Sequence, residues 1–572
     1  MSDRIEYDLL LVGGSPSSLA LALRFIELAK ESGKEFTIAI LEKGKEFGSH
    51  VMSGAVSNPH IIEKMFPDYK ESGFPIEATC TDSFFTVLGV NKKWDVPAKM
   101  YPKSLDKTGY VVLTLSNVVA WMARRLQEKA KDVPNVTIDL FNGFAAHKVV
   151  FEDGRVAGVA VSEDAKSEED YVYGKFTCFG DKGFISRDVV DHYKLRDNPQ
   201  LWSVGVKEVW SVNEDYAGKV WHTLGYPLLD GTFGGGFVYG MKDKKLTIGM
   251  VISLDSKDPN MNPQQKLQDY KKHPFIQEMI KGGKLLKYGA ALLPEGGYYS
   301  LPKKFYVPGA ILMGDALGVL DVKSLAGIDR AMECGYIAAK VLHDALAKGD
   351  TTEAALAPYQ QQLEDSFVIK ESYKNRYFRW AFMSNPKLLG QYLPDIAKSI
   401  DKSNAWVGML KVGFKNPFGA PADGVTSLSL IEGMRDIGPI TYGADRTHIV
   451  PNFAAPKYDE PQGFDKATIY SRPDAVFFAS TKYHEGNLHI DEFNADTCVK
   501  CISTYEGLGK TTPCVADCTA EVHRIDVIDD LRKHGMSLEN CVHCRTCEIV
   551  CPEINLRVNA ASQGSGPDFA GL

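Results

Sequence analysis

The sequence has no apolar run long enough to cross a bilayer, which takes about 20 consecutive apolar residues. The best candidate, residues 111–123, is interrupted by Thr114, Ser116 and Asn117. The first residues also lack the apolar core of a signal peptide and the basic, Ser-rich character of a transit peptide. We therefore expect a prokaryotic protein that stays in the cytoplasm and whose contact with any membrane is peripheral.

Basic residues are not in excess either. The 65 Lys and Arg residues against 73 Asp and Glu leave a net charge of -8. Nucleic-acid binding needs a basic face, so this balance argues against it. Repeats of solenoid period and low-complexity tracts are also absent. What remains is an average globular composition, 44% hydrophobic and 24% charged, over 572 residues. Because this length exceeds what one core supports, we expect about two to four domains.

The first 42 residues read as strand, tight turn, helix and strand. Residues 7–12 and 36–42 are apolar strand candidates, and the helix between them runs from the turn at 13–16 to about residue 30. This order is typical of the βαβ unit that opens a dinucleotide-binding domain. In such a unit the backbone N–H groups of a glycine-rich turn approach a pyrophosphate at the positive end of the helix.

The turn keeps only the first of the three glycines that usually mark it. After Gly13 and Gly14 come Ser15 and, three residues on, Ser18, where glycines are typical. Serine donates to a phosphate or caps the helix, so a binding site remains the prediction, with an ordinary βαβ turn as the alternative. Glu42 ends the second strand 29 residues after Gly13. We expect its carboxylate to accept from an adenosine ribose.

A second segment supports a flavin. Gly314 and Asp315 follow an apolar strand candidate, and Gly327 and Ile328 open a helix predicted to reach residue 347. In many flavoproteins such a pair holds the ribityl chain and pyrophosphate, and the helix dipole stabilises the reduced, anionic ring. A solvated Asp in a turn is the alternative. Because the glycines at 234–236 precede no helix signal, we see no second fingerprint and expect no NAD(P).

Cysteine is unevenly distributed. Of 11 cysteines, three (Cys80, Cys178 and Cys334) are scattered, and we interpret them as small buried hydrophobes. The other eight lie between residues 498 and 551. In a reducing compartment such a group indicates metal ligation rather than disulfides.

The grouped cysteines have ferredoxin spacing. The run C-x2-C-x2-C-x3-C-P begins at residue 541, and a second run with a 12-residue insertion begins at 498. In bacterial ferredoxins the fourth cysteine of each run serves the other [4Fe-4S] cluster. Crossing the fourth ligands predicts a first cysteine set of Cys518, Cys541, Cys544 and Cys547, and a second cysteine set of Cys498, Cys501, Cys514 and Cys551. A structural zinc site is the alternative, but it gives no reason for a third cysteine or the Cys-Pro pair.

These features together resemble the electron-transfer-flavoprotein:quinone oxidoreductase family, including bacterial versions whose flavoprotein and ferredoxin-like parts are separate chains. The resemblance covers about residues 5–350 and 484–572. Its motifs are Gly48-Ser49-His50-Val51-Met52-Ser53-Gly54-Ala55, Phe233-Gly234-Gly235-Gly236-Phe237-Val238-Tyr239, Tyr288-Gly289-Ala290, Glu295-Gly296-Gly297, Gly314-Asp315-Ala316-Leu317-Gly318 and Cys541-Val542-His543-Cys544-Arg545-Thr546-Cys547.

The resemblance implies an enzyme that passes electrons from reduced electron-transfer flavoprotein, through [4Fe-4S] and FAD, to a membrane quinone at the cytoplasmic face of the inner membrane. It implies that Lys43, Ser53 and Gly54 also contact FAD and that the first cysteine set holds the cluster. It further implies a quinone site at a turn formed by Phe233, Gly234 and Gly235, where missing side chains let a flat ring lie on the backbone. A plain Gly-rich β-turn is the alternative there. The second cysteine set would add a relay station.

We therefore expect an α/β and α+β fold. A Rossmann-like FAD-binding domain (1–80, 110–190 and 300–350) interleaves with a mixed β-sheet quinone domain (81–109 and 191–299). A helical region and Pro-rich connector (351–480) and a ferredoxin-like iron-sulfur domain (481–572) follow. Residues 406–410 are predicted to lie in a lipid interface, or alternatively to pack on the core.

Two other functions stay open at this point. A geranylgeranyl-reductase-like flavoenzyme would reduce isoprenoid double bonds without quinone. An electron-relay subunit of a flavin-bifurcating complex would co-purify with flavoprotein partners and reduce no quinone alone.

Overall fold

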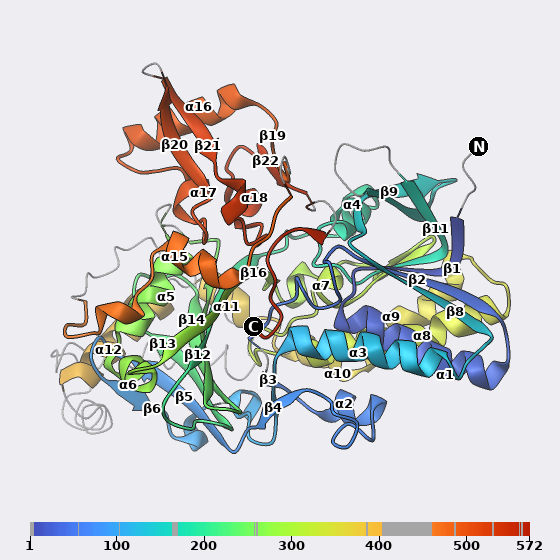
Figure 1. Ribbon diagram of the computed structural model, residues 1–572, viewed down its shortest axis with the longest axis horizontal. Helices are drawn as coiled ribbons and strands as arrows, with labels where there is room; N and C mark the ends of the chain where they lie inside the picture. Colours follow the sequence, from blue (N-terminus) through green and yellow to red (C-terminus); the bar gives the residue numbers. More distant parts are fainter. Residues whose placement is uncertain are drawn as a thin grey trace.

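The computed structural model describes residues 5–402 and 460–572, apart from residues 55, 102, 163–169, 257, 259–260, 385–386, 485–487, 529–530, 560 and 562–563. The interface segment predicted at 406–410 and most of the connector therefore lie outside the described residues. Figure 1 shows two sheets side by side, each with its own helices, and a C-terminal part in orange and red above them.

The predicted βαβ opening is confirmed. Strand β1 (Ile5–Val12) leads through the glycine turn into helix α1 (Pro16–Ser32), and β2 (Phe36–Glu42) follows. β1 and β2 pair in parallel. Helix α1 is buried almost all round because it lies between the sheet and helix α8 (Ile328–Ala347). Gly335 permits this, since a Cβ there would lie 2.0 Å from the carbonyl oxygen of Ser17.

The first sheet has eight strands, and β1 lies near its centre. Its main order is β17-β18-β11-β1-β2-β8, and β10 joins β11 to β9. The further strands are β8 (Val136–Asn142), β9 (Ala145–Glu152), β10 (Arg155–Ser162), β11 (Asp170–Phe179), β17 (Tyr306–Val307) and β18 (Ala310–Leu312). The helices around it are α2 (His60–Met65), α3 (Leu115–Ala130), α4 (Ser186–His192), α7 (Gly314–Leu317) and α9 (Ala357–Asp365). A three-stranded sheet, β3-β7-β4, consists of β3 (Val56–Ser57), β4 (Ile76–Thr79) and β7 (Val111–Leu113).

The second large sheet has seven strands in the order β16-β12-β15-β14-β13-β5-β6. Its pairs are antiparallel except for β13 and β5. The strands are β5 (Asp82–Leu88), β6 (Lys93–Asp95), β12 (Trp202–Ser211), β13 (Lys219–Gly225), β14 (Gly234–Met241), β15 (Lys245–Ser253) and β16 (Lys284–Pro294). Helices α5 (Pro263–Lys272) and α6 (Pro274–Ile280) accompany it.

The glycines predicted as a turn after Phe233 instead begin strand β14. Gly234 pairs with Ile252 and Gly235 with Val251. Glycine is required because neighbouring backbone approaches closely: a Cβ at Gly234 would lie 2.3 Å from the Val251 carbonyl oxygen, and one at Gly235 would lie 2.7 Å from that of Thr223. The turn prediction was therefore wrong, although the same glycines remain at one end of the strand.

The region after residue 350 continues as helices up to the end of the first described range. They are α10 (Phe367–Lys374), α11 (Phe378–Ser384), the π-helical turn η5 (Leu388–Tyr392) and α12 (Leu393–Lys402). In the second described range, the short helix α15 (Arg472–Val476) packs against β16. Among the described residues no helix is long and apolar enough to span a membrane.

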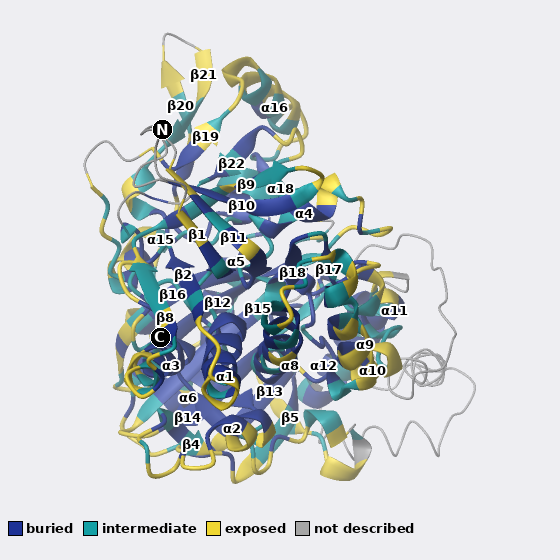
Figure 2. Cartoon of the chain, turned by 90° about the vertical axis from the view of Figure 1, so that its right-hand side faces the viewer, coloured by how far each residue is buried: buried dark blue, intermediate teal, exposed yellow. Residues whose placement is uncertain are grey.

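The C-terminal part is small and stands on the second sheet. It contains two two-stranded sheets, β19 (Ile490–Glu492) with β22 (Leu556–Val558) and β20 (His523–Ile528) with β21 (Leu531–Met536). Its helices are α16 (Ala495–Gly507), α17 (Pro513–Ala516) and α18 (Thr546–Val550). Its buried residues join the apolar core of the second sheet. Figure 2 shows exposed residues at its outer end, along α16 and the β20–β21 hairpin.

The last residues return to the centre of the molecule, where Figure 1 marks the C-terminus. Phe569 and Leu572 are buried, and a Cβ added at Gly289 of β16 would lie 2.3 Å from Leu572 and 2.8 Å from Phe569. The backbone N–H of Phe569 donates to the carbonyl of Ser49 at 2.8 Å. The tail therefore fastens the C-terminal part to both sheets.

Candidate functional site

A cavity of about 620 Å³ lies between the two large sheets and reaches the C-terminal part. Ten of the twelve residues predicted to bind FAD line it: Gly13, Gly14, Ser15, Glu42, Lys43, Ser53, Gly54, Asp315, Gly327 and Ile328. Ser18 and Gly314 do not line it; both are buried behind the wall. The three predicted quinone residues and Cys544 line the same cavity.

The phosphate turn is built with serines that pack on a distant glycine. Ser15 caps α1 by accepting from the backbone N–H of Ser18 at 3.4 Å, and its hydroxyl lies 2.9 Å from that of Ser17. A Cβ at Gly180, which follows β11, would lie 2.3 Å from the Ser18 hydroxyl and 2.6 Å from that of Ser15. Gly180 thus leaves the room that the serine hydroxyls of the turn occupy.

Glu42 braces the turn from the end of β2. Its carboxylate accepts from the backbone N–H of Gly14 at 3.1 Å and of Gly44 at 2.6 Å. Burial raises the pKa of this carboxyl, and the Gly44 hydrogen bond offsets part of that effect. The next residue, Lys43, is half-buried and also lines the cavity, and desolvation lowers its pKa to about 8. The positive charge of Arg545, in the C-terminal part, lowers the Lys43 pKa further. The side of the cavity formed by the residues predicted to bind FAD, here called the flavin wall, therefore lies close to the C-terminal part.

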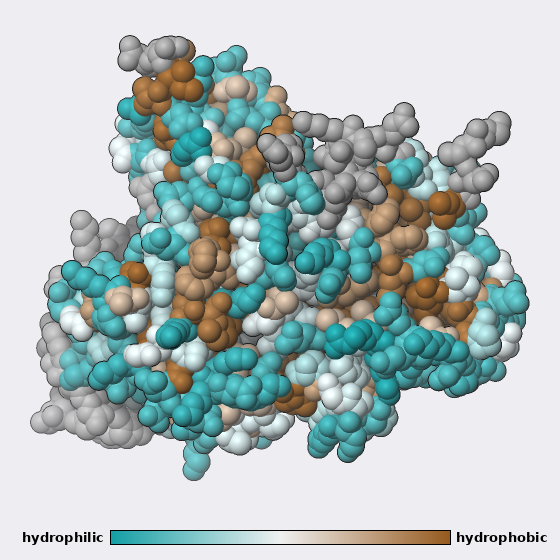
Figure 3. Space-filling view, in the orientation of Figure 1, coloured by the Kyte–Doolittle hydropathy of each residue, from teal (hydrophilic) through white to brown (hydrophobic). Residues whose placement is uncertain are grey.

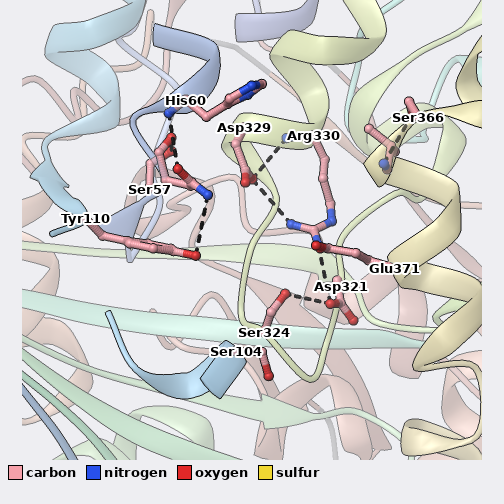
Figure 4. Close-up of polar contacts among 12 residues, drawn as sticks. Ser57, His60, Ser104, Tyr110, Asp321, Ser324, Asp329, Arg330, Ser366 and Glu371 are labelled. Carbon is pink, nitrogen blue, oxygen red and sulfur yellow. Dashed lines mark hydrogen bonds and ion pairs between the residues drawn. The ribbon is translucent and has the colours of Figure 1, made fainter. Parts of the chain in front are cut away.

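The N-terminus of α8 is held by a buried ion network, shown in Figure 4. Arg330, only 2% exposed, donates to Asp321 at 3.4 Å, to Asp329 at 3.5 Å and to Glu371. Ser324 donates to Asp321 at 2.6 Å. The loop of residues 318–327 is therefore held next to the start of the helix, where Gly327 and Ile328 line the cavity.

The predicted quinone residues lie at a mostly apolar end of the cavity. Besides Phe233, Gly234 and Gly235, this end is lined by side chains of α11, η5 and α12. The ring centroid of Phe233 lies 5.1 Å from that of Phe382 in α11. An apolar slot with few polar groups is the usual form of a site for a flat, weakly polar ligand.

Three polar residues of this cavity, Lys207, His222 and Tyr239, were not predicted as site residues, although Tyr239 belongs to one of the family motifs. Lys207 on β12 donates to the carbonyl of Ser53 at 2.8 Å, and burial lowers its pKa to about 7. His222 on β13 and Tyr239 on β14 are hydrogen-bonded at 2.8 Å, and burial lowers the His222 pKa to about 3. Period-2 alternation places each on a sheet face, but only strand pairing shows that these faces border one cavity.

The first cysteine set is brought together beside this cavity. Cys518, Cys541 and Cys547 are buried, and Cys544 also lines the cavity. Burial raises the pKa of the Cys547 thiol, and the nearby thiols of the other three raise it further. Backbone N–H groups already point at two sulfurs, from Val522 to Cys518 at 3.2 Å and from His543 to Cys541 at 3.4 Å. Such donors suit the sulfurs of an iron-sulfur cube.

Charged residues join the C-terminal part to the first sheet. Glu548 on α18 binds Arg187 on α4 at 3.0 Å and Arg545 at 2.8 Å. The Arg545 guanidinium lies 3.7 Å above the ring of Phe184, which lines the cavity. Although burial alone would raise the Glu548 pKa, Arg545 and Arg187 hold it below its usual value.

A neutral aromatic stack occupies the space between the first cysteine set and the flavin wall. The ring of His543 lies 4.7 Å from that of His489 and 5.9 Å from that of His50, and His489 stacks on Tyr483 at 4.7 Å. Both ring nitrogens of His50 are buried without a partner among the described residues. Burial lowers the His50 pKa to about 3. Sequence analysis noted His50 only as part of a motif and missed this contact.

The second cysteine set is also brought together, at a separate small pocket lined by all four of its members. Cys498 and Cys501 lie on α16, Cys514 on α17, and Cys551 directly after α18.

A dinucleotide turn, a pinned helix N-terminus and a cysteine-rich C-terminal part around one cavity define a flavin-dependent oxidoreductase with an attached iron-sulfur domain. Two family models match the chain, "ETF-QO, ubiquinone-binding" over residues 202–293 and "Electron transfer flavoprotein-ubiquinone oxidoreductase, 4Fe-4S" over residues 464–570. The chain belongs to the electron transfer flavoprotein-ubiquinone oxidoreductase family. The predicted family and fold class are thereby confirmed.

Relatives match over almost the whole chain. The protein described as a probable mitochondrial electron transfer flavoprotein-ubiquinone oxidoreductase of Schizosaccharomyces pombe is 30% identical, with 99% of this chain and 85% of that protein covered. The electron transfer flavoprotein-ubiquinone oxidoreductase of Pseudomonas aeruginosa is 28% identical, with 99% of each covered.

Among solved structures, a geranylgeranyl bacteriochlorophyll reductase-like protein from Thermoplasma acidophilum matches with a TM-score of 0.54 and 17% identity. The match covers 76% of this chain and 100% of that one. It shows a shared fold, and no isoprenoid substrate follows from it.

Proposed function

We propose that this chain oxidises reduced electron-transfer flavoprotein and reduces a membrane quinone. One observation carries the proposal: ten of the twelve predicted FAD residues, Phe233 to Gly235 and Cys544 line one cavity. FAD exchanges one or two electrons whereas an iron-sulfur cube passes one at a time, so the two together convert single electrons into the pair that a quinone takes. No NAD(P) site is needed, because the flavoprotein supplies the electrons.

Two groups of residues would hold the two cofactors, FAD and the [4Fe-4S] cluster. The turn from Gly13 to Ser15 and the start of α8 would hold the phosphates and the flavin, and Glu42 would accept from the ribose. The first cysteine set would hold a [4Fe-4S] cluster, with the N–H donors of Val522 and His543 directed at its thiolates. The domain boundaries given above follow the same division and remain a prediction.

Phe233, Gly234 and Gly235 would bind the quinone head. Both glycines line the cavity, and the flat ring of Phe233 beside them suits a flat ligand. Lys207 and the hydrogen-bonded pair of His222 and Tyr239 are the buried polar groups that line the same cavity. Reduction to quinol also requires two protons, and these groups are placed to orient the quinone oxygens or to hand on protons.

The helix α11 suggests where the quinone enters. Phe378 and Phe382 of α11 line the cavity, while Trp380 and Met383 of the same helix are 48% and 41% exposed. A helix with apolar residues on both faces, one of them at a cavity mouth, suits the boundary between protein and lipid. We place this face against the cytoplasmic surface of the inner membrane, as a peripheral contact.

The test is a steady-state assay of the anaerobically purified chain loaded with FAD and iron. Reduced electron-transfer flavoprotein should be reoxidised only when a ubiquinone or menaquinone analogue is present. Phe233→Ala should raise the KM for quinone about tenfold because it removes a uniform binding contact, whereas exposed Phe477→Ala should not. A loaded chain that leaves the flavoprotein reduced in the presence of both quinones, or that reduces isoprenoids instead, would contradict the proposal.

A further inference from the structure

The C-terminal part contains four more cysteines than one iron-sulfur cube requires. A [4Fe-4S] cluster takes four thiolates, and the first cysteine set supplies them beside the flavin wall. The second cysteine set therefore needs its own explanation. None of its members forms a disulfide, and all four are half-buried around one pocket.

The four thiols line one pocket although they come from three separate segments of the chain, α16, α17 and the residue after α18. Asn555 joins two of them, since its side-chain amide donates to the sulfur of Cys498 and its backbone N–H to that of Cys551, both at 3.2 Å. Burial raises the pKa of Cys514 to about 11, and the thiols of Cys551 and Cys501 act on it in the same direction. A ring of four thiols around one space is the donor set that a cube takes.

The backbone around Cys551 repeats the pattern of the first set. Ile554 adopts a φ of 51°, and this tight turn aims the N–H of Asn555 at the Cys551 sulfur. In the first set Glu521, with a φ of 54°, likewise precedes Val522, whose N–H donates to the sulfur of Cys518 four residues earlier. A positive φ strains a β-branched residue such as Ile554, and such strain is typical of functional sites. The strained turn therefore favours a ligand-binding role for the N–H that it directs at the sulfur.

A mononuclear metal site is the competing interpretation. Two groups of side chains could hold a single metal ion: Cys514 with His523 and His534, and Cys498 with Glu492 and His534. However, Nδ1 of His534 is 2.6 Å from Glu492, and its Nε2 is 2.9 Å from Nδ1 of His523. These three side chains are hydrogen-bonded to one another, and a site built on either group would use one cysteine of the set and leave the other three without a role.

We propose that the second cysteine set binds a second [4Fe-4S] cluster on the outer side of the first. Helices α17 and α18 pack together, and each joins the two sets: Cys514 and Cys518 flank the end of α17, and Cys547 and Cys551 lie at the two ends of α18. This crossing is the arrangement of a two-cluster ferredoxin. The proposal concerns a metal site, and it stands whether or not quinone is the acceptor.

The second site lies on the solvent side. Its pocket is bordered by Ile502 and Glu553, and the neighbouring Val499, Leu508 and Ile554 are exposed apolar side chains. Figure 3 shows further apolar side chains at the tip of this part, where the β20–β21 hairpin lies. The first set borders the flavin cavity instead. The second cluster would thus hold one electron at a time between the protein surface and the first cluster.

Iron and acid-labile sulfide per chain test the proposal directly. The anaerobically purified wild-type chain should contain about eight of each, and Cys501→Ala or Cys551→Ala should contain about four. The matched control, Cys80→Ala, removes a buried cysteine outside both sets and should keep about eight. After dithionite reduction, the paramagnetic resonance spectrum of the wild type should show two interacting clusters, and that of either variant a single isolated one.

Three outcomes would overturn the proposal: a wild-type chain with about four irons and sulfides, zinc in place of the second four irons, or full iron content in Cys501→Ala. The wild-type count decides the question even if a variant fails to fold. A chain with about eight irons that does not reduce quinone would support this site and contradict the proposed function, so the two failures are distinguishable.

Discussion

Single residues of the flavin wall show how a departure from a common motif is compensated. Ser15 and Ser18 occupy positions where glycines are typical. The sequence alone therefore did not decide between a dinucleotide-binding turn and an ordinary βαβ turn. In the structure Gly180, which follows β11, lies against both hydroxyls. Because it has no side chain, it leaves the space that the two serine side chains need. Because Gly180 lies 162 residues from Ser18 in the sequence, no local pattern reveals the compensation.

Gly180→Ala should weaken FAD binding. A Cβ there would lie 2.3 Å from the Ser18 hydroxyl and push the turn from its position. We expect a loss of about 1–3 kcal/mol in stability, as for overpacked sites, and partial loss of flavin on gel filtration. Gly507→Ala, whose Cβ would meet no atom within 4 Å, is the control. Equal flavin content in both variants would argue against this role for Gly180.

Lys207 should make stability depend on pH. Burial lowers its pKa from 10.5 to about 7 in the folded chain, and unfolding restores the higher value. Between these values the unfolded chain binds more protons than the folded one, so stability rises with pH across the window. Relative to Lys207→Met, the wild type should gain about 1 kcal/mol per pH unit between about pH 7 and 9.

Urea unfolding at several pH values measures this difference. The exposed Lys348→Met variant is the control and should follow the wild type at every pH. A difference between the wild type and Lys207→Met that stays constant from pH 7 to 9 would show that Lys207 keeps its ordinary pKa in the folded chain.

At the scale of elements, helix starts and strand ends were predicted well where the signal is local. The helix predicted from Gly327 is observed as Ile328–Ala347, because glycine and the apolar period both mark its start. The glycines after Phe233 also form a strong local signal, but for a turn. In the structure they begin strand β14 instead, where a Cβ on Gly234 or Gly235 would collide with the backbone of a neighbouring strand. This crowding results from strand pairing, which the neighbouring residues in the sequence do not reveal.

The start of α8 should depend on Arg330. Arg330→Met would leave the buried carboxylates of Asp321 and Asp329 without their cation, which costs about 3–5 kcal/mol when a buried pair loses one partner. We expect a lower urea midpoint and loss of FAD, because the loop beneath Gly327 would loosen. Arg24→Met breaks a half-exposed pair with Glu27 and should cost about 1 kcal/mol or less. Similar costs in both variants would contradict the account.

Helix α11 should mediate membrane contact. Trp380→Ser with Met383→Ser removes two exposed apolar side chains and should reduce sedimentation with anionic lipid vesicles about tenfold, with little change in FAD content. The control, Phe477→Ser, changes an exposed apolar residue beside α15 and should sediment like the wild type. Unchanged sedimentation of the double variant would place the membrane contact elsewhere.

At the scale of the whole molecule, the buried tail connects the iron-sulfur part to both sheets. Phe569 is 3% exposed and lines the flavin cavity. Phe569→Ala should destabilise the chain by about 3–5 kcal/mol and release FAD, as measured by thermal unfolding and flavin fluorescence. Phe477→Ala, at a residue 82% exposed, should change neither. An unaffected Phe569→Ala variant would mean that the tail does not close the cavity.

The sequence by itself determined the chemistry that depends on close spacing: the βαβ opening, the Gly-Asp turn before α8 and two crossed sets of cysteines. Each of these signals consists of short local patterns, such as a glycine turn or a C-x2-C run, whose spacing is fixed by local backbone geometry. The tertiary structure alone decided that ten of the predicted FAD residues, the predicted quinone residues and Cys544 share a cavity. It also decided that Gly180 makes room for the serines of the turn, and that Lys207, His222 and Tyr239 line the same cavity. Each of those facts depends on which strands pair and which faces meet, and long-range packing settles that.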